Sequence, residues 1–193
     1  MKDKLERIKQ LNNRLDKALY FTALLTKELE NSGVVPVLVG GGALEFYTQG
    51  NYMTLDIDLV VPGRDAIKSV IEMFGFSRSP GEKSWYSEEL QLSVEVPDDT
   101  LAGSMERIVA VEVEEGLTVY IIGVEDLIID RLNAYKWWNS LNDGQWATAV
   151  VYIHYDDIDF KYLRQRAGEE GVLDELEEVL SQTEKIKTRI ANK

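Results

Sequence analysis

Leucine, isoleucine and threonine recur at helical spacing along the N-terminal part of the chain, with charged residues between them. The positions that share one face are Leu5, Ile8, Leu11, Leu15, Leu19, Thr22, Leu25 and Leu29. Apolar residues three and four apart fall on one side of an α-helix, so the pattern predicts a single long amphipathic helix. Asn31-Ser32-Gly33 follows, and a glycine there is typical of a helix C-terminus.

Shorter hydrophobic runs separated by turn residues predict β-strands in the next part of the chain. The clearest is 90–96, in which apolar and polar residues alternate strictly. The other expected strands are 34–39, 57–61, 107–113 and 117–121, with a hairpin over 76–86. Helical spacing predicts helices over 42–48 and 64–74 between these strands.

The character of the chain changes after Gly123, where amphipathic segments predict four helices. These are 124–138, 145–154, 160–167 and 173–190, with breaks expected at Asn142-Asp143-Gly144 and Tyr155-Asp156-Asp157. We therefore expect an α+β fold. A mixed β-sheet core with helices, which includes the long N-terminal helix, covers residues 1–122, and a helical C-terminal part covers 123–193.

Composition narrows the functional classes. The chain has 34 Asp and Glu against 21 Lys and Arg, whereas proteins that track nucleic acid or bind membrane surfaces by charge need a basic face. It has no cysteine, which excludes disulfides and thiolate zinc sites. The charged N-terminus does not resemble a secretory signal, and no apolar run approaches the ~20 residues of a membrane span. We expect a cytoplasmic protein without a membrane partner or an extended nucleic-acid partner.

Residues 37–61 carry the candidate chemistry. A hydrophobic strand runs into three glycines, Gly40 to Gly42, which would let main-chain N–H groups approach an anion closely. Asp56 and Asp58 follow on a second strand, two residues apart, so both side chains point to one face of the sheet. This order sets a phosphate-sized gap in the backbone beside a pair of carboxylates.

Glu95 is the candidate for a third carboxylate at this site. It lies in the alternating strand 90–96 on an otherwise small polar face. Magnesium in phosphoryl-transfer sites is held by carboxylates and substrate phosphates, and two-metal sites hold their ions about 3.5–4 Å apart. Asp56, Asp58 and Glu95 are therefore the predicted ligands of a metal–triphosphate.

Each feature also has an ordinary structural explanation. An Asp-x-Asp pair on a strand is usually solvated, a glycine triplet is more often a tight turn, and Glu95 would be unremarkable on an exposed strand face. What favours the metal–triphosphate interpretation is their joint order: strand, glycines, helix, then the aspartate strand and the glutamate strand.

At these residues the chain resembles the nucleotidyltransferase superfamily that includes DNA polymerase beta. That family has Gly-Gly or Gly-Ser, a spacer, and then two aspartates around a hydrophobic residue. Here thirteen residues separate Gly42 from the aspartate strand, which is long for the pattern. More narrowly, the chain resembles small prokaryotic nucleotidyltransferases similar to abortive-infection toxins and to aminoglycoside and lincosamide nucleotidyltransferases. The segment 124–138 also looks like this branch.

The resemblance implies residue roles. Gly41 and Gly42 would bind the triphosphate, with Gly40 leaving the glycine register open, while Asp56, Asp58 and Glu95 would be catalytic and hold Mg²⁺ or Mn²⁺. A glutamate stands where the family more often has a third aspartate. It further implies transfer of a nucleoside monophosphate from an NTP to an acceptor hydroxyl, with release of pyrophosphate.

Other residues are weaker candidates. Arg131 and Lys136 lie on the first C-terminal helix and could reach phosphates, although a solvated helix face is the simpler explanation. Tyr135, Trp137 and Trp138 are expected in the core rather than on a base-stacking surface, and His154 is expected to be structural. In Asp156-Asp157-Ile158-Asp159, Asp157 or Asp159 is expected to cap a helix rather than hold a metal.

Two alternatives to an active nucleotidyltransferase remain open. One is a binding module in which the fold is kept but the site is unused, for example as the partner of a toxin or of RNA. The other is a haloacid-dehalogenase-type phosphatase, whose nucleophile strand the aspartate segment also resembles. The acceptor is unknown. Because Arg64, Lys83, Arg131 and Lys136 are few cations for an acidic chain, we expect a small molecule, a protein side chain or a short RNA end.

Overall fold

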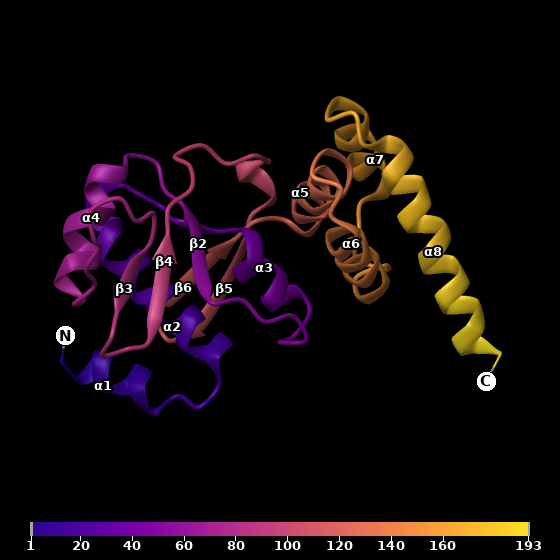
Figure 1. Cartoon of the computed structure of the whole chain (residues 1–193). Coiled ribbons are helices and arrows are strands. Elements are labelled where there is room, and N and C mark those ends of the chain that lie inside the picture. Colours follow the sequence, from indigo (N-terminus) through magenta and orange to yellow (C-terminus); the bar gives the residue numbers. More distant parts are fainter. Residues whose placement is uncertain (1, 193) are drawn as a thin grey trace. The chain divides into compact units, whose positions relative to one another are not determined.

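The computed structural model describes residues 2–192, and the side chains of all of these except residues 2, 31 and 64–66. The chain divides into two compact units, Met1–Ile122 and Gly123–Lys193, and each is described by itself (Figure 1). Across the described residues, none of the helices combines the length and apolar character that a membrane span requires.

A six-stranded mixed sheet forms the centre of the first unit, in the order β3-β4-β2-β1-β6-β5. The strands are β1 (Val37–Leu38), β2 (Asp56–Val60), β3 (Trp85–Ser87), β4 (Leu92–Glu95), β5 (Val109–Glu114) and β6 (Leu117–Ile121). β2 is parallel to β4, and β1 is parallel to β6, whereas β1–β2, β3–β4 and β5–β6 are antiparallel pairs. The expected α+β fold with a mixed sheet is confirmed.

Two strand predictions need correction. The first strand covers Val37–Leu38 and not 34–39, because Pro36 has no N–H with which to extend the ladder. The hairpin expected over 76–86 is reduced to a single antiparallel bridge between Ser77 and Tyr86, and β3 pairs instead with β4.

The hydrophobic core lies on one face of the sheet. Ile57 and Leu59 of β2 and Val94 of β4 are buried, in alternation with half-exposed acidic and polar residues. Helices α2 (Arg14–Leu29) and α4 (Arg64–Met73) pack against each other, and Figure 1 shows α2 behind the strands. Phe21 of α2 sits at their contact, with its ring 5.5 Å from that of Phe74. The acidic face of β2 and β4 is thus the face turned away from the core.

The prediction of one long N-terminal helix is wrong. The segment forms α1 (Lys2–Gln10) and α2, because the Asn13 side chain accepts a hydrogen bond from the Leu15 N–H at 2.8 Å and begins a new helix. The hydrophobic period continues across this break, so periodicity alone cannot reveal it. α2 ends in a 3₁₀ turn, η1 (Glu30–Ser32), and Gly33 closes it in the left-handed conformation at φ +67°. A second 3₁₀ turn, η2 (Met105–Arg107), precedes β5.

The second unit consists of four helices, as predicted. They are α5 (Val124–Trp137), α6 (Leu141–Ile153), α7 (Phe160–Glu169) and α8 (Leu173–Ala191). The expected cap at Asp159 is confirmed, since its carboxylate accepts hydrogen bonds from the N–H groups of Lys161 and Tyr162. The break expected at 142–144 is wrong, since Ser140 caps α6 and Gly144 lies inside the helix. A glycine is needed there because a Cβ would stand 2.9 Å from the Tyr135 ring.

Two aromatic residues at the end of α5 are not in the core. Trp137 and Trp138 are 60% and 81% exposed, which corrects the sequence-based expectation. The buried face of α5 is formed earlier in the helix, by residues such as Leu127, Ile128 and Leu132. The two tryptophans occupy the last helical position and the C-cap, beyond that packed face.

Candidate functional site

The two aspartates and the glutamate lie on neighbouring central strands, as expected. β2 carries Asp56 and Asp58, and β4 carries Glu95. In the parallel register Asp58 stands directly beside Glu95, and Asp56 beside Ser93. All three carboxylates are half-exposed and alternate with buried neighbours, so they share the face turned away from the core.

The acidic side chains do not form a ready-made metal cage. Among the described residues, no three His, Cys, Asp or Glu side chains are grouped closely enough to hold a metal ion. The Asp58 carboxylate instead accepts a hydrogen bond from the Gly41 N–H, with 3.0 Å between Oδ2 and the amide nitrogen. The donor set still fits a hard divalent cation, since all three groups are carboxylates and two are strand neighbours.

The three glycines form the first turn of α3 (Gly40–Tyr47), and each stands where a side chain would collide. A Cβ on Gly40 would lie 2.6 Å from Oδ2 of Asp58, and its φ of +54° is left-handed. A Cβ on Gly41 would lie 2.8 Å from Oγ1 of Thr54, and one on Gly42 would lie 2.8 Å from Leu38. The glycines therefore let the helix start press against the aspartate strand.

No side chain of the N-cap residue occupies the N-terminus of α3. Its N-cap, Val39, has no side chain that could accept from the first-turn N–H groups. The helix dipole adds partial positive charge at this end, and backbone N–H groups at such a terminus bind phosphate. Among the N–H groups of this turn, that of Gly41 donates to the Asp58 carboxylate.

Thr54 lies at the site but was not identified from the sequence. Its Oγ1 would lie 2.8 Å from a Cβ on Gly41, and it is half-exposed like Asp56 and Asp58. Thr54 precedes β2, and Leu55, which separates it from Asp56, is 82% exposed, so the alternation of the strand does not extend to Thr54 and the sequence carries no signal for it.

A partly buried ion pair joins α2 to the glycine helix α3. Arg14 Nη1 donates to Oε2 of Glu45 at 2.9 Å, and Glu45 is only 3% exposed. The hydroxyl of Tyr47 donates to the Ile122 carbonyl at 2.7 Å, which joins the other end of α3 to the residue that directly follows β6. The two contacts join residues that are separated by 31 and 75 positions in the sequence, so no local sequence pattern predicts them.

The remaining predicted cations are engaged elsewhere or exposed. In the second unit Arg131 pairs with Asp130 and with Asp143, the latter at 2.8 Å. Lys136 donates to the Gly171 carbonyl at 2.7 Å and pairs with Glu175 at 3.0 Å. Lys83 lies on an exposed turn, and the Arg64 side chain lies outside those that the structure describes. A role for any of them in phosphate binding stays a prediction.

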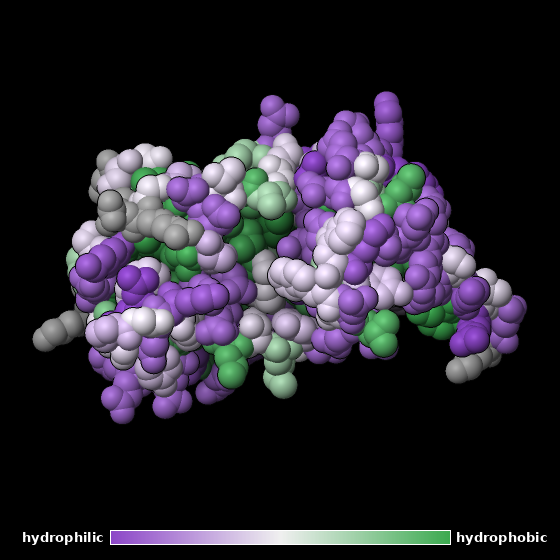
Figure 2. All heavy atoms as spheres, turned by 45° about the horizontal axis from the view of Figure 1, so that its top comes forward, coloured by the Kyte–Doolittle hydropathy of each residue, from purple (hydrophilic) through white to green (hydrophobic). Residues whose placement is uncertain are grey.

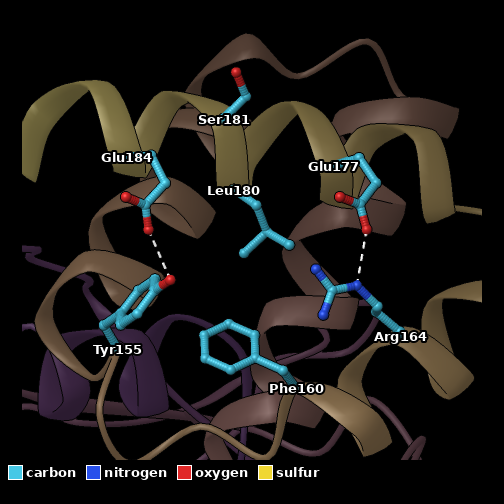
Figure 3. A pocket seen from close by; sticks show the side chains of 7 residues that line it. All are labelled: Tyr155, Phe160, Arg164, Glu177, Leu180, Ser181 and Glu184. Carbon is cyan, nitrogen blue, oxygen red and sulfur yellow. Dashed lines mark hydrogen bonds and ion pairs between the residues drawn. The ribbon is translucent and has the colours of Figure 1, made fainter.

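The face of the molecule drawn in Figure 2 is mostly polar, in keeping with a formal net charge of −13. A hollow of about 400 Å³ in the second unit contains none of the predicted site residues (Figure 3). It is lined by Tyr155, Phe160, Arg164, Glu177, Leu180, Ser181 and Glu184. Four of its polar side chains are hydrogen-bonded in pairs: Tyr155 donates to Glu184 at 2.7 Å, and Arg164 donates to Glu177 at 2.9 Å.

Comparison with known proteins identifies the family and the fold of the chain. Residues 13–190 match the family described as nucleotidyltransferase of unknown function (DUF6036). Among solved structures, the chain is similar to an antigenic nucleotidyltransferase-like protein from Paracoccidioides brasiliensis, with a TM-score of 0.53 and 15% identity over 70% of this chain and 74% of that one. It is also similar to ANT(2″)-Ia in complex with adenylyl-2″-tobramycin, with a TM-score of 0.51 and 14% identity over 79% and 94% of the two chains.

At these identities the structural likenesses establish the fold, and a search of curated proteins finds no match. The family match favours a nucleotidyltransferase over a haloacid-dehalogenase-type phosphatase. Because it covers most of the chain, from residue 13 to residue 190, the protein belongs to this family of nucleotidyltransferases.

Proposed function

We propose that the chain transfers a nucleoside monophosphate from an NTP to an acceptor hydroxyl, with Mg²⁺ or Mn²⁺ as cofactor, and releases pyrophosphate. One observation supports this best: the glycine turn and the aspartate strand are in direct contact, through the Gly41 amide and Asp58. The group suited to bind phosphate therefore lies beside the group suited to bind a divalent cation, which is what a metal–triphosphate requires.

The carboxylates have separate roles in the proposal. Asp56 and Asp58 would hold the metal from β2, and Glu95 would complete the set from β4. Bound magnesium would supply charge neutralisation on the triphosphate. On NTP binding, the Asp58 carboxylate would move from the Gly41 N–H toward the cation, and the freed N–H would be available to a phosphate oxygen. Gly41 and Gly42, at the start of α3, would hold the β- and γ-phosphates.

The proposed reaction is a single displacement at the α-phosphorus of the NTP. The acceptor oxygen forms a bond to the α-phosphorus while the bond from that phosphorus to the bridging oxygen breaks, and the electron pair leaves with pyrophosphate. The hydroxyl proton passes to a carboxylate oxygen of Glu95, which acts as the general base. Charge in this kind of transfer is stabilised mainly by positioning and electrostatics, so correct placement of α3 matters as much as the acids.

A second candidate function is a nucleotidyltransferase-fold binding module without catalysis. The observation that favours it is that, among the described residues, no three His, Cys, Asp or Glu side chains are grouped closely enough to hold a metal ion. In the contact between Asp58 and Gly41, a predicted metal ligand is also occupied by the predicted phosphate cradle. If that contact persists in the presence of NTP and metal, neither group is available for catalysis. The two candidates therefore differ in whether NTP with metal binds at this face.

The binding step can be tested by thermal unfolding with each of the four NTPs, with magnesium or manganese, and with a chelator. A ligand that binds only the folded state stabilises it by an amount set by its concentration relative to Kd, about 2.7 kcal/mol at a hundredfold excess. We expect NTP with metal to raise Tm, NTP with chelator to raise it far less, and Asp58→Asn to lose most of the shift. An unchanged Tm under all of these conditions would instead support the binding module.

A further inference from the structure

A pocket of about 290 Å³ lies in the first unit, between the N-terminal helices and the edge strand β5. β1 and β6 stand between β5 and the aspartate strand, so this pocket is separate from the carboxylate face. Its apolar walls are Leu11, Leu19, Tyr20, Val111 and Val113. Pockets that bind small molecules begin at roughly this size, ~300 Å³, and combine apolar walls with a few well-placed polar groups.

The hydroxyl of Tyr20 is one of the polar groups that line this pocket. The residue as a whole is 7% exposed, but its hydroxyl oxygen is not buried: it is open to the pocket, and no other described residue is hydrogen-bonded to it. A tyrosine hydroxyl that lines a pocket in this way is a donor available to a ligand.

Charges of both signs surround this hydroxyl. Arg7 of α1, Asp16 of α2 and Glu114 of β5 line the pocket, and none of them forms an ion pair with another described residue. Burial raises the pKa of Tyr20, the negative charge of Glu114 raises it further, and the positive charge of Arg7 lowers it. The hydroxyl is therefore near charges of both signs. Glu112, also in the lining, instead accepts a hydrogen bond from the Gly116 N–H at 2.9 Å.

We infer that this pocket binds a small zwitterion with an apolar side group, such as a free hydrophobic amino acid. The Tyr20 hydroxyl and the Arg7 guanidinium are donors suited to a carboxylate, and Glu114 and Asp16 are acceptors suited to an ammonium group. The apolar walls receive the side group. The hollow in Figure 3 differs from this pocket, because its tyrosine and arginine already donate to carboxylates within the same hollow.

The test is an NMR titration of the ¹⁵N-labelled full chain with four probes, L-leucine and three compounds that each lack one of its recognition elements. L-leucine carries all three recognition elements, isoamylamine lacks the carboxylate, 4-methylpentanoate lacks the ammonium group, and glycine lacks the side group. We expect L-leucine to shift amide resonances of α1, the first half of α2 and β5, and each incomplete probe to bind at least about tenfold more weakly, a difference of ~1.4 kcal/mol.

Variants make the assignment specific. L-leucine binding should be about tenfold weaker or more in each of three variants, Tyr20→Phe, Arg7→Gln and Glu114→Gln. If Tyr20→Phe fails to fold, the variants of Arg7 and Glu114 still test the inference. Tyr155→Phe is the matched control, since it removes a hydroxyl beside a glutamate in the other unit, and it should leave binding unchanged. The inference is overturned if L-leucine causes no shifts at millimolar concentration, if shifts map elsewhere, or if all four probes bind alike.

Discussion

The amide nitrogen of Gly41 lies 3.0 Å from Oδ2 of Asp58, across a gap of seventeen residues in sequence. This contact brings a helix N-terminus against an acidic strand, and it exists because Gly40 presents no side chain on the same side. The proposed site is therefore a feature of backbone packing first and of acidic side chains second.

Substitution of Gly40 should damage the site more than the fold. Gly40→Ala forces a left-handed residue, which costs about 1–2 kcal/mol, and puts a Cβ 2.6 Å from the Asp58 carboxylate. Gly75→Ala is the matched control, with φ +82° and nothing within 4 Å of the added carbon. Urea unfolding should show similar losses for both, whereas isothermal titration with NTP and magnesium should show weaker binding for Gly40→Ala alone. Equal nucleotide affinity in the two variants would contradict the proposed cradle.

The ion pair between Arg14 and Glu45 should contribute measurably to stability. Removing one member of a buried pair costs about 3–5 kcal/mol, and the 28% exposure of the Arg14 side chain puts the expected loss for Arg14→Met at the lower end, about 3 kcal/mol. Lys27→Met, which breaks an exposed pair with Glu30, should cost less than about 1 kcal/mol. The measurement is the free energy of unfolding in urea. A loss for Arg14→Met no larger than that for Lys27→Met would show that the pair does not anchor α3.

Neutralising the third carboxylate should separate stability from nucleotide binding. Glu95 stands beside Asp58, and like charges on one face repel when no cation is bound. Glu95→Gln should therefore leave Tm in chelator unchanged or slightly raised, while the increase in Tm with NTP and magnesium falls. Glu72→Gln, an exposed change on α4, should alter neither value. A drop in Tm in chelator for Glu95→Gln would indicate a structural role instead.

Tyr20 should make the fold sensitive to alkaline pH. Burial raises its pKa above the ordinary value of 10.0, and the charge of Glu114 adds to this. The unfolded chain then loses the phenolic proton at a lower pH than the folded chain. The stabilisation is fully present below pH 10 and is lost as pH rises through the folded pKa. Urea unfolding across this range should show a shallower loss for Tyr20→Phe than for the wild type, and identical slopes would contradict the assignment.

Local sequence patterns predicted the acidic face but not the contacts that support it. The alternation in β2 and β4 was enough to put Asp56, Asp58 and Glu95 on one side of adjacent strands, because side-chain direction in a strand has a period of two. The break at Asn13 was missed because the apolar period of the helix runs through it. The start of α6 was missed because Gly144 serves to pack against Tyr135 rather than to make a turn.

Long-range pairing accounts for the rest. Nothing in the neighbourhood of Arg14 or Glu45 identifies the other as its partner, since loop closure joins them only in the folded chain. The same holds for the pocket beside β5, whose walls come from two helices and a strand. Trp137 and Trp138 were expected in the core because aromatic side chains more often pack there than form a base-stacking surface, yet they follow the last packed turn of α5.

The most direct measurement is a transfer assay with α-labelled and γ-labelled NTP, using the full chain, magnesium, and total RNA, total protein or a small-molecule extract as acceptor. The proposed function predicts that the α-label enters an acceptor and the γ-label appears in pyrophosphate. It also predicts that Asp58→Asn abolishes the transfer and Glu72→Gln does not. Efficient, weakly salt-dependent labelling of RNA 3′ ends would identify a short RNA end as the acceptor, because extensive phosphate contact makes binding steeply salt-dependent. Transfer of the γ-label to the acceptor, or equal transfer by Asp58→Asn, would contradict the account.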